Sequence, residues 1–234
     1  VDGQGFQLAT TLGFFEAESV VVASGGLSIP TLGGSGIGYE IAKQFGHHVY
    51  PTRAGLVPFT FSDHFKEVTT RLSGNAVEAT LSNPFNSFTE ALLFTHRGLS
   101  GPSSLQLSNY WHSGQAFQID FLPSLDLHAF FKTKKTAQPK VLLRTLLNEY
   151  LPKSVVLELQ SLIWLEHADT AIGNLSDDKL EAIATQLHGF EVKPSGTEGY
   201  RTAEVTLGGV NTEEVSSKTM ESKKCKGLYF CGEV

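Results

Sequence analysis

The stretch Thr202-Ala203-Glu204-Val205-Thr206-Leu207-Gly208-Gly209-Val210-Asn211-Thr212 joins an alternating strand, Thr202 to Leu207, to a turn rich in small residues. A second strand, Gly227 to Cys231, runs into Gly232 and Glu233 in the same way. Strands that end in such residues bring bare backbone and one carboxylate to a common edge of a sheet. Nucleotide sites have this character, because a pyrophosphate and a ribose must approach the main chain closely. The C-terminal segment therefore predicts a nucleotide-binding sheet edge.

A third strand near the N-terminus supports this interpretation. In the segment 18–26, Glu18 and Ser19 lead into an apolar, β-branched run at residues 20–23, which is closed by Ser24, Gly25 and Gly26. Such a run is typical of a buried strand, and its small residues predict a ligand-facing tip. The alternative is a tight turn after a buried strand, with no ligand.

Four segments together resemble the BaiN/YhiN-like NAD(P)/FAD-dependent oxidoreductases, a family of the two-dinucleotide-binding-domain flavoproteins. They are VVVASGGLSIPTLGGSGIGYEIAKQFGH (20–47), Leu56-Val57-Pro58 as a strand, LLFTHRGLSGPSSLQLS (92–108) and EVTLGGVNTEEVSSKTMESKKCKGLYFCGE (204–233). The chain departs from the family pattern because it shows neither the N-terminal G-x-G-x-x-G turn nor the flavin loop beyond Gly-Glu. We therefore expect a central fragment of such a flavoprotein, cut through a domain at Val234.

The resemblance implies an α+β, multidomain fold: a partial Rossmann-like FAD domain plus an inserted antiparallel β-barrel with a helical subdomain. It also implies FAD as cofactor, NAD(P)H as electron donor, and hydride transfer to an activated, enone-like double bond of a small-molecule substrate. By this resemblance the flavin nucleotide lies against the backbone of Ser24-Gly25-Gly26 and of Gly208-Gly209-Val210. Gly232 and Glu233 would contact its pyrophosphate and ribitol, with Glu233 accepting a hydroxyl, and a surface turn is the alternative.

The resemblance also draws attention to the polar residues after the apolar strand that ends near Phe94. Thr95 or His96 could lie over the flavin and exchange a proton during hydride transfer, since histidine titrates near neutrality. The alternative is structural: these residues satisfy a buried turn and cap a helix that begins near Pro102. The run Gly33 to Gly38 has the wrong spacing for a Rossmann fingerprint, and is either a ligand-facing loop or a plain connector.

Periodicity suggests four parts. Residues 1–53 belong to the partial FAD domain and include a helix from Ile37 to Phe45, with Ile37, Ile41 and Phe45 on one face and Gly46 as its stop. Residues 54–123 alternate with a period near two, which suggests a small antiparallel barrel or sandwich, and the resemblance implies that this part is the inserted β-barrel. Residues 124–200 form a helical subdomain, with Pro139 and Pro152 in first turns, a shared face of Leu142, Leu146 and Tyr150, the N-cap Ser176 and the stop Gly189. Residues 201–234 return to the barrel and the FAD domain.

Composition narrows the class of protein. The 234 residues are 41% hydrophobic and 18% charged, with a net charge of −6. The negative charge argues against nucleic acid and anionic membrane as partners, and we expect a cytoplasmic protein. We expect no metal site around His47 and His48, which we interpret as surface or packing residues, and we expect Cys225 and Cys231 to be isolated thiols rather than a redox pair.

Two other classes of function stay open. The first is a non-catalytic insert or interaction module that binds no FAD on its own. The second is a serine hydrolase using Ser24 or Ser100, although the spacings suggest no acid–His–Ser constellation. If the sheet is left uncovered, strands 19–24 and 227–231 predict self-association through edge pairing.

Overall fold

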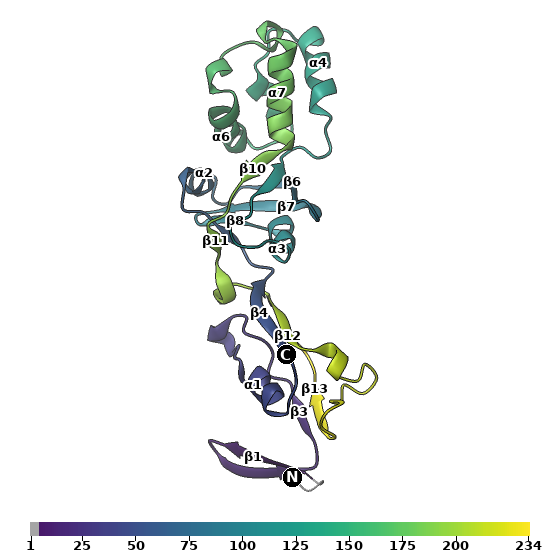
Figure 1. The fold of residues 1–234 in the computed structure, drawn as a ribbon. Coiled ribbons are helices and arrows are strands. Elements are labelled where there is room, and N and C mark those ends of the chain that lie inside the picture. The colour runs from purple at the N-terminus through teal and green to yellow at the C-terminus, as the bar shows by residue number, and fades with distance from the viewer. Residues whose placement is uncertain (1–4) are drawn as a thin grey trace. The chain divides into compact units, whose positions relative to one another are not determined.

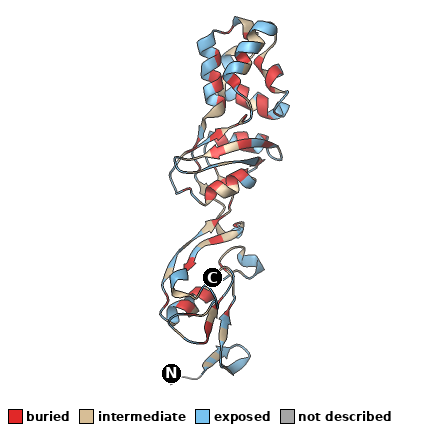
Figure 2. Ribbon diagram, turned by 90° about the vertical axis from the view of Figure 1, so that its right-hand side faces the viewer, coloured by how far each residue is buried: buried red, intermediate tan, exposed pale blue. Residues whose placement is uncertain are grey.

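The computed structural model describes residues 5–234, which form two compact units. Unit 1 combines the N-terminal residues up to Gly55 with the segment Gly199–Val234. Unit 2 is the intervening segment, Leu56–Glu198. Each unit has its own cluster of buried hydrophobic residues, and buried residues are red on the ribbon in Figure 2. No helix among the described residues is long and apolar enough to cross a membrane.

Unit 1 is built from three strand pairs. The hairpin of β1 (Phe6–Thr10) and β2 (Gly13–Ala17) is antiparallel. Next, β3 (Val20–Val22) pairs in parallel with β13 (Leu228–Phe230), so chain segments far apart in sequence lie side by side (Figure 1). The third pair, β4 (Val49–Gly55) and β12 (Val205–Val210), is antiparallel. The parallel pair has the local geometry of an α/β sheet, whereas a Rossmann-like domain remains a prediction.

The core of unit 1 forms where α1 (Ile37–Gln44) covers these strands. Tyr39 and Ala42 of the helix pack with Val22, Leu228 and Phe230. Gly46 follows the helix with a φ of 79°, which confirms the predicted glycine stop. The predicted apolar face is wrong at one position, because Ile37 is 53% exposed and the helix instead buries Gly38. Short 3₁₀ turns at Pro30–Leu32, Gly199–Arg201 and Thr212–Glu214 complete the unit.

Unit 2 contains a seven-stranded sheet in which every neighbouring pair is antiparallel. The strands, in the order of the sheet, are β10 (Phe190–Val192), β9 (Phe117–Asp120), β6 (Ala76–Ser82), β7 (Ser87–Thr95), β8 (Gly98–Ser100), β5 (Phe59–Thr60) and β11 (Gly196–Thr197). Two of them, β10 and β11, follow the helices in sequence and form the two edge strands of the sheet. Leu56, with a φ of 44°, and the two residues after it form no strand, which corrects the expectation for this segment.

The helices of unit 2 lie against this sheet and beyond it (Figure 1). They are α2 (His64–Arg71), α3 (Pro102–Ser108), α4 (Leu127–Ala137), α5 (Leu143–Leu147), α6 (Lys153–Ile163) and α7 (Asp177–His188), with 3₁₀ turns at Leu165–His167 and Ile172–Asn174. Asp63, Asp126 and Ser176 accept backbone N–H groups as N-caps, so the predicted cap at Ser176 is confirmed.

Two details of the predicted helical subdomain are wrong. Pro139 lies after α4 rather than in a first turn, and α5 ends at Leu147, so Tyr150 shares no helix with Leu142. Prolines and leucines in a short connection carry the same local pattern as a helix start, which explains the error. Pro152 is the N-cap of α6, next to the predicted first turn, and Gly189 follows α7 as expected.

Candidate functional site

The candidate site lies where the parallel strands β3 and β13 end. Their register pairs Val22 with Phe230, and the N–H of Cys231 donates to the carbonyl of Val22 at 3.1 Å. The carboxyl ends of parallel neighbours meet at one edge, so the segment 24–26 and the segment 232–233 are adjacent. In open α/β sheets, ligands bind outside such carboxyl ends. The structure thus brings five of the predicted cofactor residues to one sheet edge.

Thr206 joins these two segments. Its N–H donates to Glu233 Oε1 at 2.7 Å, and its hydroxyl oxygen accepts the N–H of Leu27 at 2.9 Å and lies 3.0 Å from Ser28 Oγ. The carboxylate of Glu233 therefore has one oxygen fixed by backbone. Sequence reasoning missed Thr206, because it appeared only as one polar residue in an alternating strand.

Tyr39 is a second residue that the sequence did not single out. It is buried in α1 and donates from its hydroxyl toward the carbonyl of Glu233 at 3.5 Å. Burial, together with the charge of Glu233, raises the pKa of the phenol above its ordinary value. Tyr39 is therefore a neutral hydrogen-bond donor at neutral pH. It helps to hold the strand end in place.

The predicted cofactor glycines fall into two groups. Gly25 and Gly232 have φ values of 71° and 81°, and apart from the adjoining residues no described atom lies within 4 Å of where a Cβ would stand. By contrast, a Cβ on Gly26 would lie 2.6 Å from Thr206 Oγ1, and one on Gly208 would lie 2.3 Å from the carbonyl oxygen of Pro51. The first pair presents accessible backbone, whereas the second serves internal packing.

Gly209 and Val210 also have internal roles. Gly208 and Gly209 form an irregularity in the pairing of β12 with β4, with a register shift between Leu207 and Gly209. A Cβ on Gly209 would meet the backbone of Val234 at 3.2 Å. Val210 is buried in the core of unit 1. These residues shape the strand edge, and their side-chain positions are filled by protein.

The strand-end residues fit a dinucleotide such as FAD. Gly25 and Gly232 would let phosphate oxygens approach the main chain, because only a glycine leaves such backbone uncovered at positive φ. Of the two carboxylate oxygens of Glu233, Oε1 accepts the N–H of Thr206, whereas Oε2 makes no hydrogen bond among the described residues. Oε2 can therefore accept from a hydroxyl. This chemistry suits the pyrophosphate and polyol parts of the cofactor. Among the described residues, no three His, Cys, Asp or Glu side chains gather as a metal site.

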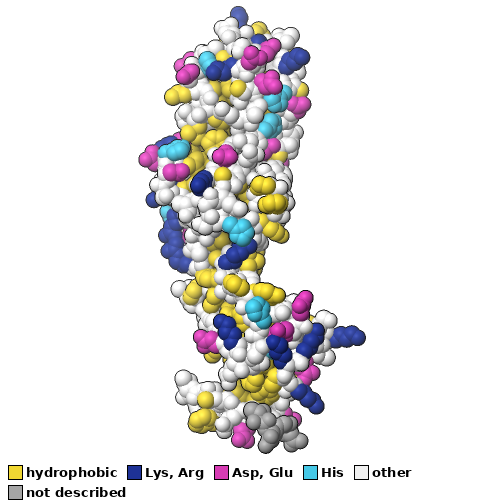
Figure 3. All heavy atoms as spheres, in the orientation of Figure 1, with side chains coloured by type: hydrophobic (Ala, Val, Ile, Leu, Met, Phe, Trp, Pro, Cys, Tyr) yellow, Lys and Arg dark blue, Asp and Glu magenta, His cyan; other side chains and the backbone are white. Residues whose placement is uncertain are grey.

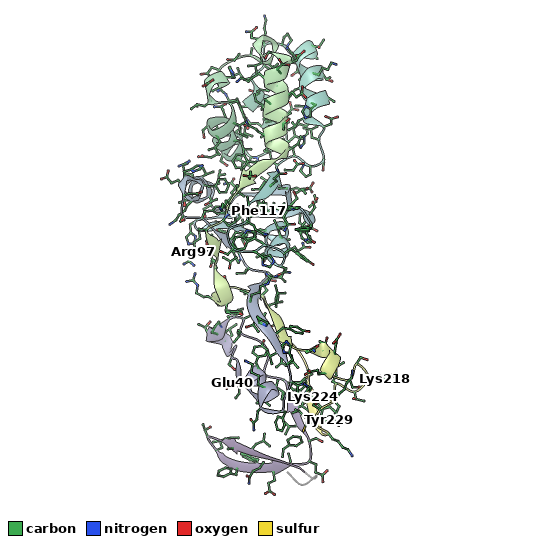
Figure 4. The ribbon with its side chains drawn as sticks, in the orientation of Figure 1. Glu40, Arg97, Phe117, Lys218, Lys224 and Tyr229 are labelled. Atoms are coloured by element: carbon green, nitrogen blue, oxygen red, sulfur yellow. The ribbon has the colours of Figure 1, made fainter. Side chains whose placement is uncertain are left out.

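Thr95 and His96 lie in unit 2, at the turn between β7 and β8. The Thr95 hydroxyl donates to the carbonyl of Gly98 at 3.2 Å and accepts the N–H groups of Arg97 and Gly98 at 3.3 and 3.1 Å. His96 is exposed, and its carbonyl accepts from Thr70. Arg97, labelled in Figure 4, pairs with Glu198 at 3.2 Å. Thr95 therefore satisfies the turn, as the structural alternative predicted. A helix does begin at Pro102, but its N-cap is Gly101 and no side chain caps it, so the predicted capping role is wrong.

An acid–His–Ser arrangement does occur in unit 1, although the spacings suggested none. His47 Nε2 lies 2.7 Å from Ser222 Oγ, and His47 Nδ1 lies 3.2 Å from Glu214 Oε2. His47 and Ser222 are only 4% and 6% exposed, and Ser222 Oγ also accepts two backbone N–H groups, from Lys224 and Cys225. A nucleophile so enclosed cannot meet a substrate, so this network is structural.

The same network connects the segment between β12 and β13, residues 211–227, to the rest of unit 1. Lys224 Nζ lies 2.7 Å from Glu214 Oε1 and donates to the carbonyl of Gly46 at 2.6 Å (Figure 4). Burial lowers the pKa of His47, an effect that the nearby Glu214 partly offsets. His48, next in sequence, is exposed and packs edge-on against Tyr50. Cys225 and Cys231 are both free, which confirms two isolated thiols.

Comparison with known proteins adds two kinds of relative. The chain is 47% identical, over its full 234 residues, to a ribosomal RNA dihydrouridine synthase of Escherichia coli, and 46% identical over 224 residues to a protein of the same name from Haemophilus influenzae. It is also 26% identical over 245 aligned positions to a 3-dehydro-bile acid delta(4,6)-reductase of Clostridium scindens. The chain spans 58%, 54% and 60% of the lengths of these relatives.

These names correct one expectation. The net charge of −6 argued against nucleic acid as a partner, and two relatives named for ribosomal RNA contradict that argument. Net charge is a sum over the whole chain and does not exclude local contacts. Figure 3 shows Lys and Arg side chains interspersed with Asp and Glu on the visible face. The expectation "no nucleic acid" is therefore wrong.

The family assignment comes from the middle of the chain. A sequence profile described as the HI0933-like protein barrel and H2TH domain matches residues 53–205, which include all of unit 2. The antiparallel sheet and the helices of unit 2 agree with that description, and so does the mixed α+β character predicted from sequence. The resemblance to FAD-dependent oxidoreductases is supported at the same coarse level by the reductase relative. The chain belongs to the HI0933-like family.

Proposed function

We propose that this chain supplies part of a flavin-dependent reductase that converts uridine in ribosomal RNA to dihydrouridine. The observation that carries the proposal is the 47% identity, over the whole chain, to a relative of that name. The strand-end geometry around Gly25, Gly232 and Glu233 supports it, since it suits a dinucleotide cofactor. Because the chain spans 58% of that relative, the activity belongs to the proposal.

Uracil has the kind of activated double bond that was expected in the substrate from the sequence. The C5–C6 double bond of uracil is conjugated with the C4 carbonyl, as the double bond of an enone is conjugated with its own. Its reduction adds a hydride at C6 and a proton at C5, with the electron pair drawn from NAD(P)H, which becomes NAD(P)⁺. When bound, FAD supplies the hydride-transfer chemistry between these partners.

We assign three tasks to residues of the chain. The backbone at Gly25 and Gly232 receives the cofactor's pyrophosphate, and Glu233 accepts a hydroxyl of its polyol. His96 gives the proton to C5, because an imidazole can act as a general acid and this one is exposed. Thr95 is a positioning residue, since its hydroxyl holds the turn that carries His96.

A chimera tests the proposal. Residues 1–234 replace the matching stretch of the E. coli relative, and the purified protein is incubated with FAD, NAD(P)H and unmodified ribosomal RNA transcripts. Digestion to nucleosides followed by mass spectrometry measures dihydrouridine. We expect bound flavin and dihydrouridine formation, both reduced in a Glu233→Gln variant, and formation alone reduced in a His96→Gln variant. Bound flavin with no dihydrouridine in any transcript would refute the RNA substrate.

Two further arms address the alternatives. The same chimera is offered a 3-dehydro-bile acid, because the 26% identical relative is named for reducing one. Reduction of the bile acid but not of RNA would favour a small-molecule reductase. In the second arm, FAD is titrated into the chain by itself and into the chimera. If neither binds flavin, the result would favour the non-catalytic interaction module.

A further inference from the structure

Unit 2 contains a cavity of about 330 Å³ that the strand-end site does not use. It is lined by strand β6 at Ala76–Glu78, by the segment Phe121–Leu125 and by the segment Tyr150–Pro152, which leads into α6. Binding pockets for small molecules begin at about 300 Å³, and they are mostly apolar with a few placed polar groups. This cavity meets both conditions.

The walls are fixed by hydrogen bonds just outside the cavity. Ser154 Oγ donates to Asn75 Oδ1 at 2.9 Å, which ties the first turn of α6 to the residue before β6. The N–H of Leu122 donates to Asp120 Oδ1 at 2.9 Å, and Tyr150 packs edge-on against Phe130. The cavity is therefore formed before any ligand arrives, so little ordering entropy opposes binding.

The polar groups of the cavity are an acceptor and a hydroxyl. Glu78 is exposed, and its Oε1 accepts from Ser124 Oγ at 3.2 Å. Glu78 lines the cavity, and no ion pair of Glu78 is found among the described residues, so its carboxylate has no neutralising cation there. Around it lie apolar side chains, including Val77, Phe121 and Leu151, and the half-exposed ring of Tyr150.

This combination selects a particular kind of ligand. A flat, largely apolar ring suits the walls, and two adjacent N–H donors suit the two oxygens of a carboxylate. Guanine presents such a pair, at N1 and N2. The other RNA bases place an acceptor beside their donor, which would face the carboxylate unfavourably. A phosphate is excluded from the interior by the same negative charge.

We propose that this cavity binds one unpaired guanine base of the RNA. The inference rests on the proposed function for the source of the base, and it adds a second contact point in unit 2. Proteins recognise single-stranded RNA by stacking splayed bases on aromatic side chains and bonding their Watson–Crick edges. Tyr150 and Glu78 supply these two contacts, and Lys153, exposed and next to Pro152, attracts the flanking phosphate.

The test uses the full chain and fluorescently labelled RNA pentamers of uridine with one central guanosine, inosine or adenosine, or none. Binding is measured by fluorescence anisotropy. Inosine lacks the N2 amino group, so it loses one hydrogen bond to a charged acceptor. We expect the guanosine pentamer to bind about tenfold more tightly than the inosine pentamer. Its preference over the adenosine pentamer and over the pentamer of uridine alone should be at least as large.

Variants assign the preference to the cavity. Glu78→Gln should remove the preference for guanosine over inosine, because one acceptor oxygen is replaced by a donor. Glu181→Gln is the matched control, since it makes the same change on the exposed surface of α7. It should leave the preference unchanged. Tyr150→Leu should weaken binding of the guanosine pentamer about tenfold, through loss of stacking.

Several outcomes would overturn the proposal. They are equal binding of guanosine and inosine pentamers, an unchanged preference in Glu78→Gln, or no binding of any pentamer. Free guanosine monophosphate that binds as tightly as the pentamer would replace RNA by a free nucleotide as the occupant. Failure of this proposal and failure of the proposed function are separable, because the pentamers report binding without flavin and dihydrouridine formation reports reduction.

Discussion

The packing of Gly26 against Thr206 yields the sharpest prediction for the strand-end site. In Gly26→Ala the new methyl group would lie 2.6 Å from Thr206 Oγ1, 2.8 Å from Thr206 Cβ and 2.9 Å from Glu233 Oε2. The threonine cannot easily rotate away, because it is β-branched and its hydroxyl is bonded to Leu27 and Ser28. We expect the overpacking to cost about 1–3 kcal/mol of folding free energy.

A double-mutant cycle isolates this contact. Thr206→Ala alone leaves the N–H of Leu27 without its acceptor, at a cost of about 1–3 kcal/mol. It also removes the atom nearest to the new methyl group, so the double variant should be more stable than the sum of the two changes by about 0.5–2 kcal/mol. Urea unfolding followed by circular dichroism measures all four proteins.

Gly25→Ala is the matched control for this cycle. Its methyl group meets no described atom within 4 Å outside the adjoining residues, so its cost comes mainly from the φ of 71°, about 1–2 kcal/mol. It should therefore add to Thr206→Ala within about 0.5 kcal/mol. If Gly26→Ala also adds to Thr206→Ala without coupling, the close approach of residues 26 and 206 is refuted, and with it the geometry of the site.

Three further predictions concern stability. Burial lowers the pKa of His47, so the unfolded chain binds more protons than the folded chain as the pH falls below 6.5, and unfolding should become easier there. His47→Asn should remove this pH dependence, which is measured as the change of the urea midpoint with pH. The lowered pKa of Glu214, which pairs with Lys224, should add a further loss of stability only below pH 4.5. Thr95→Ala should destabilise the chain by about 1–2 kcal/mol through its lost turn bonds, and unchanged stability with lost reduction would instead make Thr95 catalytic. Gly101→Ala should cost more than about 2 kcal/mol in thermal or urea unfolding, since φ is 85° and Ala91 O lies 2.6 Å from the new atom.

Features coded by neighbouring residues were predictable from the sequence. The N-cap Ser176, the stops at Gly46 and Gly189, and the helix after Gly101 each depend on side chains a few positions away. The antiparallel character of the sheet followed from a period of two in β6 and β9. In each case local geometry and the hydrophobic pattern point to the same structure.

Features made by distant residues were not predictable in the same way. The hydroxyl of Thr206 meets Leu27 across 179 residues, and His47 meets Ser222 across 175. No spacing in the sequence announces such a pair, so Thr206 was overlooked and an acid–His–Ser arrangement was not expected. Glycines pose a related problem, because sequence alone cannot separate the accessible backbone of Gly25 from the packing contact of Gly26.

In the proposed function, one cofactor site at the strand ends would serve whichever substrate the complete protein reduces. Its accessible contacts at Gly25 and Gly232 are main chain, which would bind a pyrophosphate whatever the substrate is. Selection between a bile acid and an RNA nucleotide must therefore come from side chains elsewhere. The cavity at Glu78 offers side-chain recognition in unit 2, the part of the chain that the family profile covers in full. Net charge could not reveal this, because a base is recognised by hydrogen bonds and stacking rather than by a surplus of lysine and arginine.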